Sequence, residues 1–303
     1  MSESIREAMD TSKQGNRLLP ILSLLFSATL WGLIWYPLRL LEEQGLAGLW
    51  SALISYGTIF VLFLPVMVRE RASLQSNFLP FLLMALSAGW CNVAFIMAVL
   101  DGNVVRVLLL FYLSPFWAVC LGWLLLGERL DGQSVLVFAI AVAGAIIMLW
   151  DESLGMPWPR DTADWLAVSS GFAFALSNVF VRGLQNVSVL LKSTGSWAGV
   201  VVVASLWIWL GSNAFPAVAG GVLLAAVLLG LCGFLVMTLS VLYGVTRMPL
   251  HRSAVILLFE LVVGAISALL LTDELVLPRE WLGGFMVVTA AALAARIHSR
   301  DEA

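Results

Sequence analysis

One carboxylate lies well inside an apolar run, at Glu260 within residues 250–272. A charged carboxylate at the centre of a bilayer costs about 2.5–3.5 kcal/mol on insertion scales, so such residues usually face protein or a wet cavity. Its chemistry allows three roles. Glu260 can bind an ammonium group, carry a coupling proton, or hold a neighbouring helix through hydrogen bonds.

A second apolar run, residues 104–126, is interrupted by Ser114-Pro115. Proline removes one backbone hydrogen bond and clashes with the preceding turn. Lipid offers no substitute partner for the carbonyl that is freed near Phe111, so the break must be buried in protein or face a wet cavity. We therefore expect a kink at Pro115 in a helix that lines a pathway. A kink that only packs against other helices is the alternative.

Further polar and aromatic side chains lie inside the other apolar runs. Amides and hydroxyls within membranes usually bond across helices, whereas an aromatic wall can hold an apolar group or a cation. For each residue alone, cross-helix bonding or ordinary packing is the simpler role. Trp31 and Trp35 are expected on one helix face, because they are four residues apart. The candidate substrate-binding set is Glu260, Trp90, Asn92, Tyr112, Ser114, Asn178, Thr238, Ser240, Tyr243, Trp31 and Trp35.

Two arginines, Arg106 and Arg252, lie at the starts of the apolar runs that contain Pro115 and Glu260. They can pair across a gate or attract a substrate carboxylate, and we group them with Pro115 as gating or kink candidates. Snorkelling of the long side chains to the headgroups is the simpler explanation.

Composition identifies the elements that must position these residues. The chain has 303 residues, of which 61% are hydrophobic and 12% charged, whereas soluble domains carry about 25% charged residues. Such a chain needs lipid as a solvent, and a helix of about 20 residues crosses a bilayer. A barrel is excluded, because the runs are apolar on every side rather than alternating. The predicted all-α spans are 18–41, 47–68, 78–100, 104–126, 133–150, 163–184, 193–211, 217–244, 250–272 and 280–297.

The distribution of basic residues predicts the orientation. With both termini in the cytoplasm, twelve of the 16 Lys and Arg residues fall on the cytoplasmic side, as the positive-inside rule requires. We predict a cytoplasmic tail at 1–17, a first repeat at 18–150, a periplasmic linker at 151–162, a second repeat at 163–297 and a cytoplasmic tail at 298–303.

The chain repeats itself with an offset of 146 residues, which places Arg106 on Arg252 and Glu128 on Glu274. Each half then holds five spans. Because five is odd, the second half is inverted relative to the first. Inverted repeats are common in secondary transporters, where the substrate site lies near the middle of the membrane between the halves.

These features resemble the EamA-type branch of the drug/metabolite transporter superfamily over nearly the whole chain. The most specific match is LLLFYLSPFWAVCLGWLLLGERL at residues 108–130. The family often has Glu-Pro in the ninth helix, but here Leu261 follows Glu260, which leaves a kink in that helix open. The resemblance is greatest to bacterial amino-acid exporters, including the aromatic amino-acid exporter. It implies a bacterial inner-membrane protein and outward transport.

The predicted function is a secondary transporter of small amphipathic metabolites, above all aromatic and other neutral amino acids. A neutral cavity with one carboxyl group also admits hydrophobic cations, so multidrug export is the alternative substrate class. A non-transporting membrane enzyme or scaffold is the alternative from another class. The sequence contains no phosphate-binding loop, HExxH or GxSxG motif. We expect a small molecule and lipid as partners, no nucleic acid, no cofactor or metal, and a monomer sufficient for function, although a homo-oligomer is also compatible.

Overall fold

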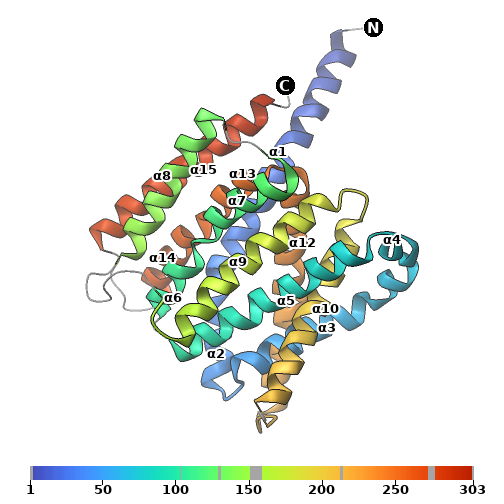
Figure 1. Ribbon diagram of the computed structural model, residues 1–303, viewed down its shortest axis with the longest axis vertical. Coiled ribbons are helices and arrows are strands. Elements are labelled where there is room, and N and C mark those ends of the chain that lie inside the picture. The colour runs from blue at the N-terminus through green and yellow to red at the C-terminus, as the bar shows by residue number, and fades with distance from the viewer. Residues whose placement is uncertain are drawn as a thin grey trace.

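The computed structural model describes residues 3–102, 104–128, 131–150, 159–211, 214–271 and 277–301. Every regular element in these ranges is helical. Ten segments are long and apolar enough to cross a membrane, as the sequence predicts, and Figure 1 shows them as one bundle. Figure 1 also shows α1 beginning and α15 ending at the same end of this bundle, which an even number of spans requires.

We number the spanning segments 1 to 10. Several consist of more than one helix, and the short α4 (Arg71–Ser76) joins spans 2 and 3. The helices that contain the spans are, for span 1, α1 (Glu3–Leu33) and α2 (Trp35–Glu43); for span 2, α3 (Gly48–Arg69); for span 3, α5 (Phe78–Asp101); for span 4, α6 (Val104–Phe111) and α7 (Ser114–Leu126); for span 5, α8 (Gly132–Leu149); for span 6, α9 (Thr162–Gly183); for span 7, α10 (Val189–Leu210); for span 8, α11 (Gly220–Leu228), η2 (Leu229–Phe234) and α12 (Leu235–Arg247); for span 9, α13 (Leu250–Leu257) and α14 (Phe259–Leu271); and for span 10, α15 (Pro278–Asp301). Span 1 itself begins at Leu18 within α1, and span 10 ends at Ile297 within α15.

Polar side chains between the spans set where several helices begin. Asp131, Asp161 and Ser188 accept hydrogen bonds from backbone N–H groups in the first turns of α8, α9 and α10, which satisfies donors that a helix start leaves unpaired. Hydrogen bonds from Ser134 hold the pKa of Asp131 below its usual range. The predicted linker at 151–162 lies mostly outside the described residues, as does Glu274.

The packing pairs follow the repeat: when each span is replaced by its equivalent in the other half (1 by 6, 2 by 7, 3 by 8, 4 by 9 and 5 by 10), the pairs stay the same. Span 3 packs on span 6 and span 8 on span 1, while span 4 packs on span 6 and span 9 on span 1. Spans 2 and 7 pack on each other, and so do spans 5 and 10; the latter pair, α8 and α15, lies along one side of the bundle in Figure 1. This pattern is the one that two inverted five-helix repeats predict.

Four spans depart from a continuous α-helix. Span 1 is interrupted at Ile34, span 4 between Phe111 and Ser114, and span 9 at Leu258, while span 8 contains the π-helical turn η2. The sequence left the kink of span 9 open because Leu261 replaces the family proline. The interruption at Leu258, with φ −59° and ψ −15°, therefore does not depend on a proline. π-Turns and broken helices are concentrated at functional sites.

Candidate functional site: a central cavity

A cavity of about 140 Å³ lies among spans 1, 2, 3, 4, 6, 7, 8 and 9. Engineered cavities of about 150 Å³ in soluble proteins hold a benzene-sized molecule. The lining is mostly apolar and aromatic, with one carboxylate at Glu260 and no Lys, Arg or His among the described lining residues. The cavity therefore suits a small, largely apolar molecule with a few polar groups.

The cavity lies where the two halves meet. Lining residues from one half often have their repeat equivalents in the lining from the other half. In six pairs, the two residues are 146 positions apart and both line the cavity: Trp31/Ser177, Asn92/Thr238, Phe95/Val241, Phe111/Leu257, Tyr112/Leu258 and Ser114/Glu260. Equivalent positions can surround one cavity only if the axis that relates the halves passes through it.

Most of the residues predicted from the sequence reach this cavity. They are Trp31, Asn92, Tyr112, Ser114, Pro115, Asn178, Thr238 and Glu260. The carboxyl group of Glu260 interacts with the Tyr112 hydroxyl of span 4, so the two interrupted helices, 4 and 9, meet at the cavity. The predicted kink at Pro115 is present, and the residues around it line the cavity.

Trp35 and Trp90 do not line the cavity. Trp31 lines the cavity and Trp35 does not, although Ile34, which lies between α1 and α2, keeps right-handed helical angles of φ −65° and ψ −25°. The Trp35 indole N–H instead donates to Ser267 Oγ at 2.9 Å. Trp90 is 36% exposed, and its indole donates to Ser169 Oγ at 3.2 Å.

Ser240 and Tyr243 also lie outside the cavity lining. The backbone carbonyl of Ser240 accepts a hydrogen bond from Ser23 Oγ at 2.6 Å, which joins spans 8 and 1. The guanidinium carbon of Arg247 lies over the ring of Tyr243, 3.7 Å from the ring centroid, in a cation–π contact. Val241 and Leu242, which lie between these two residues on α12, do line the cavity.

Arg106 and Arg252 are buried rather than snorkelling to the surface, at 7% and 8% exposure. Arg106 Nε lies 2.7 Å from Asp164 Oδ2, which ties the start of span 4 to the start of span 6. Neither arginine lines the cavity. Arg106 thus forms a buried link between the halves at one end of the bundle, and the gating role of the two arginines stays a prediction.

The carbonyl freed by Pro115 is covered by a glycine of the other half. A Cβ built on Gly171 of α9 would lie 2.5 Å from the Phe111 carbonyl oxygen and 3.3 Å from its carbon. Span 9 shows a similar arrangement, since a Cβ on Gly32 of α1 would lie 2.7 Å from the Glu260 carbonyl oxygen. Glycine therefore allows close helix approach at the interruption of span 4 and at the start of α14, just after the interruption of span 9.

We expect Gly171→Ala to lower the free energy of unfolding by about 1–3 kcal/mol, the usual cost of overpacking, because the added methyl group would meet the Phe111 backbone. Thermal unfolding in detergent measures this effect. Gly221→Ala is the control, since nothing lies within 4 Å of a Cβ at that helical position. Equal stability of the two variants would contradict this account of the break.

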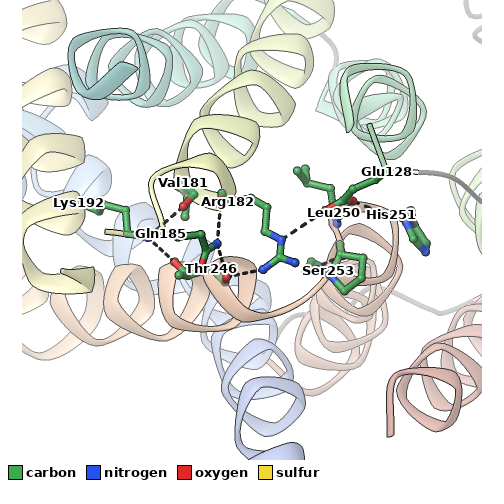
Figure 2. A network of polar contacts seen from close by, with 10 residues as sticks. Glu128, Val181, Arg182, Gln185, Lys192, Thr246, Leu250, His251 and Ser253 are labelled. Carbon is green, nitrogen blue, oxygen red and sulfur yellow. Dashed lines mark hydrogen bonds and ion pairs between the residues drawn. The ribbon is translucent and has the colours of Figure 1, made fainter. Parts of the chain in front are cut away.

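A polar network joins the halves at the end of the bundle opposite the Arg106–Asp164 pair. Glu128, just after α7, accepts a hydrogen bond from the Leu250 N–H at 2.8 Å and so caps the start of α13. Arg182 Nε donates to Glu128 Oε1 at 3.3 Å, and Arg182 Nη1 donates to the Thr246 carbonyl at 2.7 Å. Figure 2 shows Arg182 reaching between Glu128 and Thr246. We call these contacts the Glu128 clasp.

Lys192 extends this network and was placed differently by the sequence. The predicted span began at residue 193, but α10 begins at Val189 and Lys192 is fully buried. Its Nζ donates to the Val181 carbonyl and to Thr246 Oγ1 (Figure 2). It also donates to the Leu184 carbonyl at 3.3 Å. A cation is favourable there, because α9 ends at this point with its carbonyl groups unpaired.

Glu128→Ala is expected to lower the free energy of unfolding by about 1–2 kcal/mol, which is the usual effect of losing a helix cap. Glu128→Gln retains an acceptor for the Leu250 N–H and should retain most of the stability. Thermal unfolding of the two variants and the wild type checks the order. The clasp would be contradicted if the alanine variant were as stable as the glutamine variant.

The sequence missed contributions from spans 2 and 7. Tyr56 lies on α3, and Ser196 and Trp197 lie on α10, and all three line the cavity. Tyr56 is a mid-span polar residue and Trp197 lies within the Gly195–Gly199 spacing, so both signals were present. Neither residue was predicted to line the cavity, because aromatic residues and glycines in spans usually serve packing.

Ten membrane-spanning segments, arranged as two repeat-related halves around a central cavity, define a multi-pass membrane protein. Residues 18–150, the first five spans, match the EamA-like transporter family. A solved structure described as "Crystal structure of protein" superposes on this chain with a TM-score of 0.70 and 16% sequence identity. The match covers 95% of this chain and 99% of the other chain, and this likeness shows the fold alone. No curated protein is a match.

Proposed function

We propose that the protein is a secondary transporter of small amphipathic metabolites, above all aromatic and other neutral amino acids. One observation carries the proposal: repeat-related residues from both halves surround one cavity. Rocking of inverted halves around such a site exposes it alternately to each side of the membrane. The match of residues 18–150 to a transporter family supports this class.

The amino-acid assignment is supported by the chemistry of the lining. The Glu260 carboxyl group can receive an ammonium group, while the rings of Phe95, Phe111 and Phe174 offer an apolar surface. A phosphorylated substrate is disfavoured, because the described lining contains no basic side chain. The Lys and Arg distribution favours cytoplasmic termini, and with the resemblance to bacterial exporters it supports an inner-membrane location and outward transport.

Counterflow in proteoliposomes tests the proposal. Purified protein is reconstituted with unlabelled tryptophan or phenylalanine inside, and uptake of the labelled amino acid is measured against protein-free liposomes. Accumulation above the control is the expected result. Counterflow of hydrophobic cations but not of amino acids would change the proposed substrate class from amino acids to hydrophobic cations, as in multidrug export. The absence of counterflow across amino acids and cations would overturn the transporter and favour a membrane enzyme or scaffold.

A further inference from the structure

The two asparagines of the cavity, Asn92 and Asn178, differ in their hydrogen bonding. Asn92 is committed to the protein: its Nδ2 donates to the Ala88 carbonyl at 2.9 Å, and its Oδ1 accepts from the Tyr56 hydroxyl at 3.0 Å. Asn178 lines the same cavity at 7% exposure. Among the described residues its amide makes no hydrogen bond. Asn92 is thus a structural bridge, whereas Asn178 is available to a ligand.

A buried amide without a partner costs free energy. The carboxamide of Asn178 carries two donors and one acceptor, and an apolar side chain of similar shape would avoid the cost of burying them. An uncommitted amide at a cavity wall is therefore better suited to binding than to folding.

The other uncommitted polar groups of the cavity are rich in donors. In the part of the chain that the structure describes, the side chains of Trp31, Ser114, Trp197 and Thr238 also line the cavity without a hydrogen bond. An indole N–H can only donate, while hydroxyls can donate or accept. The single carboxyl group, Glu260, is on span 9 and already meets Tyr112. The remaining wall can thus receive an acceptor group, and no basic side chain competes for it.

We propose that Asn178 is a specificity-determining residue that donates to the carboxylate of a zwitterionic substrate, while Glu260 receives the ammonium group. The residue distinguishes an amino acid from the corresponding amine, which lacks the carboxylate. This inference rests on the proposed function and deepens it. A site built around a hydrogen bond rejects the analogue without the bonding group far more strongly than an apolar pocket does.

The test combines ligand-free stability with binding of a matched ligand pair. Asn178→Leu, Asn92→Leu and the wild type are compared by thermal unfolding in detergent, and phenylalanine and phenethylamine by binding titration. Asn178→Leu should unfold at or above the wild-type temperature, while Asn92→Leu should unfold below it. Asn178→Leu should bind phenylalanine about tenfold or more weakly, with phenethylamine changed by less than about threefold.

A second variant, Asn178→Asp, tests whether the group next to residue 178 is a carboxylate. Asn178→Asp places a negative charge beside the expected carboxylate position, so it should lose phenylalanine more severely than Asn178→Leu and retain phenethylamine. The inference would be overturned by a fall in the stability of Asn178→Leu that equals that of Asn92→Leu. Unchanged phenylalanine binding, or equal losses for both ligands, would also overturn it.

The outcomes separate this inference from the proposed function. If the wild type binds phenylalanine and the variants keep its selectivity, only the role of Asn178 fails. If the wild type binds neither phenylalanine nor phenethylamine, the amino-acid substrate class fails, and the role of Asn178 fails with it.

Discussion

Glu260→Gln is expected to reduce amino-acid counterflow by about tenfold or more, because the neutral amide can neither bind an ammonium group as an anion nor carry a proton. The shape of the side chain is retained, and the amide oxygen can still accept from Tyr112. The fold should therefore persist. Counterflow of labelled tryptophan in proteoliposomes, together with thermal unfolding in detergent, measures the two properties separately.

The matched control is Glu43→Gln, because Glu43 is 60% exposed at the end of α2 and pairs with Arg39, four residues earlier. This variant should transport like the wild type. Unchanged flux in Glu260→Gln between about pH 5 and 8, the range of raised carboxyl pKa values, would remove Glu260 from the mechanism. If Glu260→Gln lowered the unfolding temperature in detergent so far that the loss of counterflow followed from unfolded protein, the residue would be reassigned to helix packing.

Asp164→Leu is expected to give the largest loss of stability, about 3–5 kcal/mol in the free energy of unfolding, because the buried guanidinium of Arg106 loses its carboxylate. Asp164 is 2% exposed and also accepts the backbone N–H of Arg160 at 2.9 Å. The variant should therefore loosen the start of α9 as well as the link to span 4. Thermal unfolding in detergent measures the loss.

The double variant Arg106→Leu/Asp164→Leu tests the cause. Removal of both partners eliminates the buried charge, so the double variant should be more stable than Asp164→Leu alone. Glu43→Ala, which breaks the exposed Arg39–Glu43 pair, should have little effect, because exposed ion pairs contribute little. A double variant less stable than Asp164→Leu would show that the pair is not the source of the effect.

The kinks show where prediction from sequence stops. Pro115 predicted the break in span 4, because a missing N–H is encoded by one residue. The interruption of span 9 at Leu258 has no such residue. Just after it, the start of α14 packs against Gly32 of span 1, a contact between helices far apart in the sequence that no local pattern encodes.

The asparagines give the same lesson for the site. Both are amides in apolar runs, and cross-helix bonding was the simpler prediction for each. Asn92 meets Tyr56 of span 2, whereas Asn178 meets no polar partner among the described residues. The difference is decided by the neighbour across the interface, which the chain supplies from another span.

The sequence by itself determined the ten spans, their division into two halves and the position of Glu260 inside a span, because the cost of a polar group in lipid applies to each residue separately. Only the tertiary structure decided which polar side chains are satisfied within the protein and which face the cavity. Span 1 illustrates the limit: Trp31 lines the cavity, whereas Trp35 donates to Ser267. Hydrophobicity is a local property, whereas hydrogen-bond partnership belongs to pairs of residues brought together by the fold.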